Sequence, residues 1–477
     1  MIANLIGSDW RSPDGGVTTL PVFNPATGEV IEHVPLSGAA EVDAAVGAAA
    51  SAYAKWSHTP VMERVRLMFN FKSLLEKQFD ELAAITTRHH GKTLEEARGE
   101  VRRGIEVVDF ACGAPTLLQG RTLRDVSGGV DQDLYRYPLG VCAGIPPFNF
   151  PVMIPLWMFP LAVVAGNTFI LKPSERTPLG GQRLAEIFLE AGFPEGVLNV
   201  VHGARDAVEA LLRHPDVAAI SFVGSAPVAR HVYETAAANG KRVQALGGAK
   251  NHIVVMPDAD PDIAVPAILN SAFGNAGERC LAGSVAVAVG AAADALINPL
   301  TEAAARLVVG PGDEPGVQVG PLIRSDHRDK VAGYIDKGVA EGADLVVDGR
   351  GEMKRRGFFL DPTILDHVTA DMEVGREEIF GPVLSIARAA SLDEAISQAN
   401  RMALGNMATI FTQSGKSGRE FRDHVEAGMT GINVPIAQPF AFFPFSGWKG
   451  SFYGDLHVHG TDGIDFFTRK KVVVTRW

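Results

Sequence analysis

Cys280 is the residue in this chain best equipped for chemistry. It lies in the run Phe273-Gly-Asn-Ala-Gly-Glu-Arg-Cys280-Leu-Ala-Gly-Ser284, where small neighbours make it a poor core residue and an accessible one. Arg279 precedes it, and a nearby positive charge lowers the pKa of a thiol and so favours the nucleophilic thiolate. The run therefore predicts a reactive cysteine of lowered pKa. Because a single cysteine is more often structural than catalytic, the prediction depends on the rest of the chain.

Asn149 is a second candidate, in the proline-rich segment Pro146-Pro-Phe148-Asn149-Phe-Pro151. A buried amide needs hydrogen-bond partners. One interpretation is structural, with the side chain holding its own loop together. The other is catalytic, with the side-chain NH₂ donating to an oxyanion that forms on a substrate. The residues alone leave both open.

Two segments could hold the riboses of a nucleotide, although no GxGxxG motif follows an early strand. Lys172-Pro-Ser-Glu175 follows an expected strand, where the lysine can donate to a ribose and Glu175 can accept from its 2′-hydroxyl. The same carboxylate would repel a 2′-phosphate, which favours NAD over NADP. Further on, Glu378-Ile-Phe380 joins a carboxylate to an aromatic ring, which suits the second ribose and the nicotinamide. Its alternative interpretation is a helix end and turn.

A third segment could hold a pyrophosphate. Gly224-Ser225 follows an expected strand and opens an expected helix, and backbone N–H groups at a helix N-terminus bind phosphate oxygens. The alternative is that Ser225 is an ordinary helix cap.

Composition limits the class of protein. The 477 residues suggest two or three lobes, and the 46% hydrophobic and 21% charged residues suit a globular protein with a large core. The net charge of −11 argues against a general binder of nucleic acid or anionic membranes. Three widely spaced cysteines without a CxxC pair lead us to expect no disulfide framework, no metal site and a reducing, cytoplasmic location. The first residues show no signal-peptide pattern.

One apolar stretch, residues 150–166, invites a membrane interpretation. Pro151, Pro155 and Pro160 interrupt it, and prolines are costly in a helix that must satisfy its own backbone in a bilayer. We therefore expect a buried segment and no membrane span.

The hydrophobic pattern predicts an α/β fold. Residues 39–120 are mainly helical, and residues 121–140 alternate like exposed antiparallel strands. Residues 141–255 alternate strands with helices, as in a doubly wound parallel sheet, and a second α/β stretch covers about 260–433. No repeat or linker separates these parts, so we expect interwoven lobes. The expected strands are 168–171, 197–201, 218–223, 252–255 and 471–475, and the expected helices are 61–78, 92–110, 179–191, 204–213 and 226–239.

In this order, the segments resemble the aldehyde dehydrogenase superfamily over essentially the whole chain. The resemblance implies a Rossmann-type NAD-binding lobe at residues 1–120 and 141–248, an α/β catalytic lobe at 249–459 and a β oligomerisation arm at 121–140 and 460–477. It also implies a homotetramer built as a dimer of dimers. The motifs that carry it are Pro147-Phe-Asn149-Phe-Pro151, Gly166-Asn-Thr-Phe-Ile-Leu-Lys172-Pro-Ser-Glu175, Ile220-Ser-Phe-Val-Gly224-Ser225, Gly277-Glu-Arg-Cys280, Glu377-Glu378-Ile-Phe380-Gly-Pro382 and Asn433.

The resemblance implies a role for each candidate. Cys280 is the nucleophile that attacks an aldehyde, and Asn149 stabilises the oxyanion together with the backbone N–H of Cys280. Hydride then passes to NAD⁺ and leaves a thioester on the enzyme. The implied NAD contacts are Phe148, Lys172, Glu175, Gly224, Ser225, Glu378 and Phe380.

Release of that thioester divides the superfamily. Hydrolytic members carry a general-base Glu in a Glu-Leu-Gly-Gly-Lys motif, whereas this chain has Gln244-Ala245-Leu-Gly-Gly-Ala-Lys250, with Ala245 in the place of the Glu. Such a base typically contributes ~10²–10⁴-fold, so coenzyme A becomes the expected acceptor. The alternatives are a hydrolytic enzyme that makes a free acid with Glu278 or another carboxylate as base, and a non-catalytic protein that kept the fold.

Together with Gly240-Lys-Arg-Val-Gln244, three further runs closely resemble the CoA-acylating methylmalonate-semialdehyde dehydrogenases. That resemblance implies methylmalonate or malonate semialdehyde as substrate and, after loss of CO₂, propionyl-CoA or acetyl-CoA as product. The substrate carboxylate needs a cation, and the resemblance points to Arg279 and Arg103, since a guanidinium binds a carboxylate bidentately. The adjacent Arg102 could equally face inward. The runs are Gly248-Ala-Lys-Asn-His252, Pro155-Leu-Trp-Met-Phe-Pro160 and Ser451-Phe-Tyr-Gly-Asp455.

Overall fold

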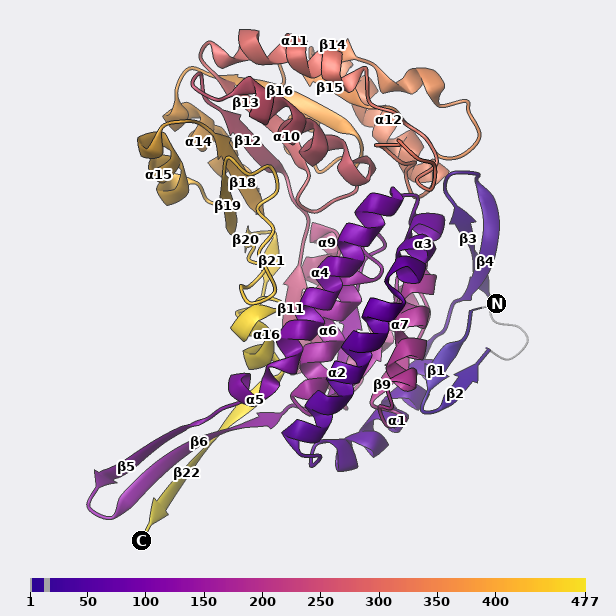
Figure 1. The fold of residues 1–477 in the computed structure, drawn as a ribbon, viewed down its shortest axis with the longest axis vertical. Helices are drawn as coiled ribbons and strands as arrows, with labels where there is room; N and C mark the ends of the chain where they lie inside the picture. The colour runs from indigo at the N-terminus through magenta and orange to yellow at the C-terminus, as the bar shows by residue number, and fades with distance from the viewer. Residues whose placement is uncertain (1, 13–17) are drawn as a thin grey trace.

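Two α/β lobes and a projecting three-stranded arm make up the computed structural model, which describes residues 2–12 and 18–477 (Figure 1). The larger sheet has eight strands, five of which run parallel. In order across it, the strands are β2 (Asp9–Arg11), β1 (Asn4–Ile6), β9 (Leu198–Val200), β8 (Thr168–Leu171), β7 (Val141–Ile145), β10 (Val217–Val223), β11 (Arg242–Leu246) and β21 (Phe452–Tyr453).

Helices cover both faces of this sheet, and their apolar sides form two separate clusters of buried residues. One face carries α2 (Val61–Lys77), α3 (Phe79–His90), α4 (Leu94–Cys112), α6 (Met153–Val164) and α7 (Pro178–Glu190). The other carries α1 (Ala39–Trp56), α8 (Arg205–Arg213) and α9 (Ala226–Ala238). The short α5 (Ala114–Leu117) follows α4, and a hairpin of β3 (Thr19–Asn24) and β4 (Glu29–Pro35) lies beside the lobe.

The second lobe is built on a seven-stranded sheet that is parallel except at one edge. Its strands, in order, are β14 (Asp344–Val347), β15 (Thr363–Asp366), β16 (Val383–Ala389), β13 (Gly283–Val289), β12 (Asn251–Val255), β18 (Met407–Phe411) and β19 (Met429–Ile432). One face packs on α10 (Pro261–Phe273), α11 (Ala292–Ala304) and α12 (Ser325–Ala340), and the other on α14 (Leu392–Asn400) and α15 (Gly415–His424). Shorter elements are the 3₁₀ turns η1 (Gly274–Gly277) and η2 (Gly349–Glu352), the helix α13 (Glu373–Arg376) and the pair β17 (Leu404–Gly405) and β20 (Trp448–Lys449).

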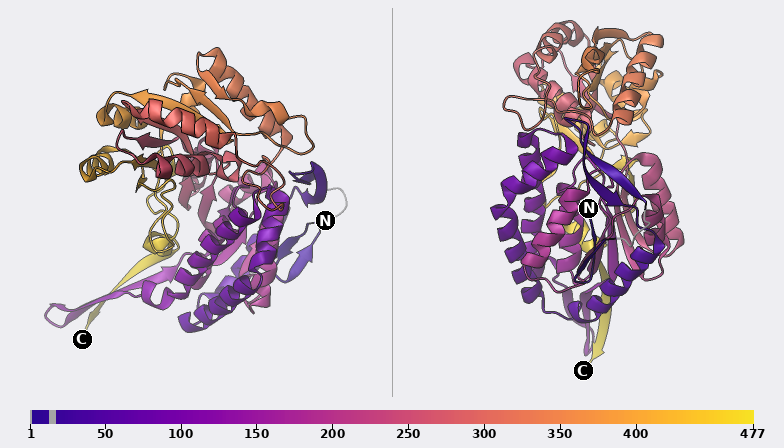
Figure 2. Two further views of the ribbon diagram at one scale, coloured as in Figure 1. Left: turned by 45° about the horizontal axis from the view of Figure 1, so that its top comes forward. Right: turned by 90° about the vertical axis from the view of Figure 1, so that its right-hand side faces the viewer.

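The arm consists of β22 (Thr468–Arg476), β6 (Val130–Pro138) and β5 (Arg121–Ser127) in that order across the sheet. It extends away from the body, and Figure 2 shows the same projection from two further sides. Its apolar side chains are exposed, with Leu123, Val472 and Val474 each at least 60% accessible. The helix before it, α16 (Gly460–Phe466), packs against α6 in the body.

The apolar segment with three prolines forms α6, and all twelve of its residues are buried. Pro155 lies in the first turn, where no backbone donor is lost, and Pro160 lies inside the helix. The helix packs closely on α4, since a Cβ added at Gly104 would lie 2.7 Å from Leu156 Cδ1. Within the described residues, no helix has the length and apolar character that crossing a bilayer requires.

The expected elements are largely confirmed. The strand at 168–171 has the predicted bounds, and the predicted helices at 61–78, 179–191, 204–213 and 226–239 match within one residue at each end. The helix expected from Lys92 begins at Leu94, because the Thr93 side chain accepts from the backbone N–H of Glu96 and caps it. The separate helix α3 was not predicted. It ends at Gly91, whose φ of +97° suits glycine.

Candidate active site

Cys280 lies in the turn between η1 and β13, at the amino end of a central strand of the second lobe. It is half-buried. Its backbone carbonyl accepts from two side-chain amides, Nδ2 of Asn251 at 2.8 Å and Nδ2 of Asn406 at 2.9 Å. Both amides come from neighbouring parts of the sheet, so the turn that carries the sulfur is fixed from two sides.

The predicted lowered pKa of Cys280 is wrong. Burial raises the pKa of its thiol to about 12, and the negative charge of Glu378 raises it further, whereas Arg279 only partly opposes the shift. The sequence prediction counted the adjacent cation and missed the cost of desolvating a thiolate. In the free protein at neutral pH, Cys280 is therefore a protonated thiol.

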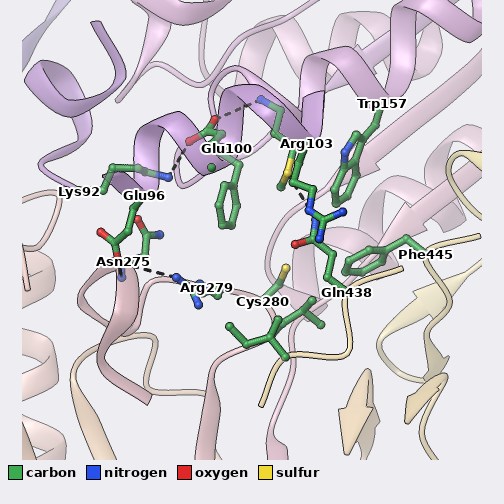
Figure 3. A pocket seen from close by; sticks show the side chains of 15 residues that line it. Lys92, Glu96, Glu100, Arg103, Trp157, Asn275, Arg279, Cys280, Gln438 and Phe445 are labelled. Carbon is green, nitrogen blue, oxygen red and sulfur yellow. Dashed lines mark hydrogen bonds and ion pairs between the residues drawn. The ribbon is translucent and has the colours of Figure 1, made fainter. Parts of the chain in front are cut away.

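The sulfur faces a cavity of about 220 Å³ between the two lobes. Figure 3 shows Arg103 and Arg279 on either side of Cys280, with Gln438 and Phe445 beside it. Two guanidinium groups around one thiol make the cavity suitable for a small molecule that carries a carboxylate. Its lining residues are Lys92, Glu96, Gly99, Glu100, Arg103, Phe150, Met153, Trp157, Asn275, Arg279, Cys280, Leu281, Ile436, Gln438 and Phe445.

The orientation of α4 determines which of its two adjacent arginines, Arg102 or Arg103, faces the cavity. Arg103 lines the cavity, where its Nη1 lies 2.9 Å from a Glu106 oxygen and its guanidinium lies 4.4 Å from the Phe440 ring centre. Arg102 points elsewhere, into a bidentate pair with Glu76 at 2.7 and 2.9 Å. Consecutive residues of a helix point about 100° apart, and of these two long side chains Arg103 is the one that faces the cavity.

Asn149 follows β7 and is almost fully buried, with 3% of its surface exposed. Its Nδ2 donates to the backbone carbonyl of Glu278 at 2.9 Å, two residues before the cysteine. The structure thus brings Asn149 to the turn of Cys280, where its side chain bonds to that turn and not to its own loop. One of its two amide hydrogens remains for a further acceptor.

Glu278 is not placed to act as a base on a substrate. Its carboxyl is fully buried and does not line the cavity. One oxygen accepts from the backbone N–H of Ile323 at 3.2 Å, and the two oxygens lie 3.8 Å and 3.6 Å from His90 and His327. Burial raises the pKa of this carboxyl well above its usual range. Glu278 therefore has a structural role, in which its buried carboxyl stabilises the turn that carries Cys280.

The predicted position of the missing base needs a correction. Ala245 is fully buried in the cluster on the face of the sheet that carries α9, away from the cysteine. Leu246 points to the opposite face and belongs to the cluster that includes Leu281 and contacts Cys280. Successive strand residues point to opposite faces, so Leu246 is the nearer position. It also lacks a carboxyl group.

The first lobe's candidate nucleotide-binding residues lie at the carboxyl ends of the strands of the larger sheet. From β7 the chain moves to β8 and β9 on one side and later to β10 and β11 on the other. In open α/β sheets, ligands bind outside the carboxyl ends of the strands where the order reverses, here between β7 and β10. Lys172 follows β8, with Nζ 2.7 Å from the carbonyl of Gly203 and 3.5 Å from Glu175.

The pyrophosphate candidate lies at the same edge, after β10. Gly224 has no space for a side chain, because an added Cβ would lie 2.5 Å from its neighbour Phe222. Ser225 is the N-cap of α9, yet its hydroxyl makes no bond to the helix backbone. The first turn of α9 thus keeps backbone donors that a phosphate oxygen could accept from.

Glu378 and Phe380 enter this region from the second lobe. Glu378 accepts from the backbone N–H of Ala249 at 2.9 Å, and burial raises the pKa of its carboxyl to about 7. Phe380, at a φ of +58°, meets the ring of Phe148 edge-on at 5.9 Å. Lys172 and Gly224 thus lie at the carboxyl ends of β8 and β10, and Phe380 of the second lobe meets Phe148 of the first. The donors, acceptors and rings present fit a dinucleotide.

Three cavity residues on α4 and just before it were missed. Glu96 and Glu100 are four residues apart, a spacing that places side chains on one face of a helix, and Lys92 lies four residues earlier, just before the helix begins. With Arg103 they form a charged stripe that the spacing alone could have revealed. Glu96 accepts from the backbone N–H of Asn275 at 2.6 Å and lies 3.7 Å from Arg279.

Comparison with known proteins agrees with this geometry. The pattern of the aldehyde dehydrogenase family matches residues 10–473. The chain belongs to the aldehyde dehydrogenase family. It is 55% identical over 478 residues to malonate-semialdehyde dehydrogenase 2 of Geobacillus kaustophilus (strain HTA426), covering 100% of this chain and 99% of that one. This aldehyde dehydrogenase has, in the part of the chain that the structure describes, no group of three or more His, Cys, Asp or Glu side chains that could hold a metal ion.

Solved structures give the same family. A methylmalonate-semialdehyde dehydrogenase from Oceanimonas doudoroffii is 49% identical with a TM-score of 0.98, covering 100% of this chain and 98% of that one. A Sinorhizobium meliloti 1021 protein that was assigned the same name, complexed with NAD, is 45% identical with a TM-score of 0.98 and the same coverage. The predicted aldehyde dehydrogenase fold is confirmed.

Proposed function

We propose that this aldehyde dehydrogenase oxidises malonate or methylmalonate semialdehyde with NAD⁺ and transfers the acyl group to coenzyme A. The observation that carries the proposal is the cavity: Arg103 and Arg279 flank the thiol of Cys280. Two cations in a small cavity select a substrate with an anionic end. The names of the relatives from Geobacillus kaustophilus and Oceanimonas doudoroffii support the same substrate class.

The chemistry assigned to the chain begins at Cys280. Its thiol proton passes to solvent, the sulfur attacks the aldehyde carbon, and the electron pair of the C=O bond moves to the carbonyl oxygen. Asn149 Nδ2 and the backbone N–H of Cys280 donate to that oxygen. Bound NAD⁺ would supply the hydride acceptor, and the residues that would hold it are Phe148, Lys172, Glu175, Gly224, Ser225, Glu378 and Phe380. The acyl group then remains on the sulfur as a thioester.

Transfer to coenzyme A is supported by what the cavity carboxylates already bind. Glu96 accepts at one oxygen from Asn275 and at the other from the backbone N–H and hydroxyl of Thr93. Glu100 accepts at one oxygen from Lys92 and at the other from backbone N–H groups. Neither is free to activate a water, so a thiol nucleophile releases the acyl group. Loss of CO₂ breaks the bond between the substrate carboxylate and the α-carbon, and the α-carbon then takes a proton from solvent to give the acetyl or propionyl group for that transfer.

The proposal includes an assembly and a location. The arm with exposed Leu123, Val472 and Val474 supports a homotetramer in which arms pair between subunits, since exposed apolar strands seek partners. Cys112, Cys142 and Cys280 are free thiols, which supports a reducing cytoplasmic location.

The test is NADH production from malonate semialdehyde and NAD⁺, with and without coenzyme A, with the product identified by mass. We expect turnover that depends on coenzyme A and yields acetyl-CoA. Steady turnover to a free acid without coenzyme A would favour the hydrolytic alternative, with Glu378 as the carboxyl to examine. A Cys280→Ala variant is the control for uncatalysed oxidation.

A further inference from the structure

A buried ion pair beside the cavity has no part in the chemistry above. Lys92 Nζ lies 2.7 Å from a Glu100 oxygen, and both side chains are at most 1% exposed. Burial lowers the pKa of Lys92, and the charge of Glu100 opposes that shift. A buried ion pair is seldom better for stability than an apolar pair of the same size, because both charges lose their water. Stability alone therefore does not explain why this ion pair is buried beside the cavity.

The lysine holds the residue assigned to the oxyanion. Lys92 Nζ donates to the backbone carbonyl of Asn149 at 2.6 Å, which is shorter than an ordinary N–H···O bond. The same ammonium lies 4.1 Å from the ring centre of Phe150, the next residue. The carboxylate of Glu100, the carbonyl of Asn149 and the ring of Phe150 surround the ammonium group. No side of this group remains free to bind a substrate.

The glutamate holds the other end of the same segment. Its second oxygen accepts from the backbone N–H groups of Val152 and Met153 at 2.8 and 3.1 Å, at the start of α6. Figure 3 shows Glu100 beside Lys92. The ion pair therefore holds the backbone at two places, the carbonyl of Asn149 and the N–H groups of Val152 and Met153.

Asn149 is held at its side chain as well. Nδ2 donates to the Glu278 carbonyl at 2.9 Å, and Glu278 belongs to the other lobe. Lys92 itself is preceded by Gly91, where an added Cβ would lie 2.8 Å from Pro321 of the other lobe. The position of the amide thus depends on contacts at both its backbone and its side chain.

We propose that Lys92 and Glu100 are a positioning pair that sets Asn149 for oxyanion stabilisation. Neither touches the reacting atoms; they act through the backbone of residues 149–153. The inference rests on the proposed function, in which Asn149 donates to the oxyanion. Because the pair acts only on a charge that develops in the transition state, its loss lowers kcat and leaves substrate binding nearly unchanged.

The test is a double-mutant cycle with kcat, KM and the rate of the first NADH turnover as readouts. The double variant Lys92→Met/Glu100→Gln removes both charges, and its glutamine keeps an oxygen for the α6 amides. We expect kcat to fall about a hundredfold and KM to change less than about threefold. Added to Asn149→Ala, the double variant should cause little further loss, because both changes remove the same interaction.

Two controls separate this role from a structural one. Arg388→Met/Asp366→Asn removes a bidentate ion pair in the seven-stranded sheet, at 2.5 and 2.9 Å, and should lower the melting temperature without lowering kcat. Glu100→Gln alone is the milder variant if the double variant does not fold, and about a tenfold loss of kcat is expected.

Losses that add in the cycle, or a loss carried by KM, would overturn the positioning role while leaving the proposed function intact. If Asn149→Ala alone keeps full kcat, the oxyanion assignment itself fails, and this inference fails with it.

Discussion

The two walls of the cavity are built in opposite ways. The helix wall, which consists of Lys92, Glu96, Glu100 and Arg103, lies on α4 and the turn before it. Each of these side chains has a charged partner or several hydrogen bonds. The loop wall, which consists of Ile436, Gln438 and Phe445, lies between β19 and β20, where the chain forms no regular structure.

The loop wall is held more weakly at its centre. Gln438 lines the cavity, and its side-chain amide donates to the sulfur of Met153 at a distance of 3.6 Å. Phe440, Phe442 and Phe443 beside it are more than half exposed. Phe445 is the anchored end, with its ring 5.1 Å from that of Trp157.

The difference between the helix wall and the loop wall assigns a separate task to each. A charge that must meet a carboxylate needs a fixed place, because a misplaced guanidinium loses both its bonds and its water. An apolar wall that only limits size can move by a few tenths of an ångström at little cost. We therefore expect substrate charge to be recognised by Arg103 of the helix wall together with Arg279, and substrate size by the loop wall. Four changes test this division, in order of expected effect.

Replacing the thiol between the walls should have the largest effect. Cys280→Ser should lower kcat by at least about a thousandfold, because a serine hydroxyl is a far weaker nucleophile without a base. Steady-state NADH production measures it. Dinucleotide binding, followed by NADH fluorescence, should stay unchanged. If Cys280→Ser keeps more than a tenth of the activity, neither wall surrounds the reacting group.

Removing a cavity guanidinium comes next. Arg279→Gln should lower kcat/KM for malonate semialdehyde about a hundredfold, since it breaks a buried charge contact with the substrate. Activity with propionaldehyde, which has no carboxylate, should change less than about threefold. Arg103→Gln should follow the same pattern, with Arg102→Gln as the matched surface control. Equal losses with both aldehydes would mean that the arginines only support the fold.

The thiol itself should titrate far above neutrality. Because burial raises the pKa of Cys280 to about 12, the thiolate fraction of the free enzyme rises with pH over the whole range below that value. Alkylation by iodoacetamide should therefore accelerate about tenfold per pH unit between about pH 7 and 10. Mass spectrometry can follow it, with Cys280→Ser as the control for the other two thiols. A plateau near pH 8 would show that the positive charge of Arg279 outweighs the effect of burial on the pKa of Cys280.

Enlarging the loop wall should have the smallest effect. Ile436→Ala should raise the ratio of kcat/KM for methylmalonate over malonate semialdehyde by about tenfold or less, since one methyl group is all that distinguishes these substrates. The dependence on the substrate carboxylate should not change. A variant that loses both substrates equally would argue that this wall is as rigid as the other.

The sequence predicted which chemical groups the active site contains, but not what surrounds each of them in the fold. It predicted Cys280 and Asn149, and the structure brings them to one turn through Glu278. It predicted a lowered pKa for Cys280, and that was wrong, because burial depends on residues distant in the chain. The stripe of Lys92, Glu96 and Glu100 was missed, although its spacing was readable, since charged residues on a helix are usually solvent-exposed.

The sequence by itself determined the family, the alternation of strands and helices, and the kinds of group available to the reaction. These follow from local patterns and from the order of motifs along the chain. The tertiary structure alone decided that Arg103 and not Arg102 faces the cavity, that Leu246 and not Ala245 lies toward the cysteine, and that Lys92 holds Asn149. Each of these depends on which face of a helix or strand is buried and against what. Packing between residues far apart in the sequence sets that, and no local pattern contains it.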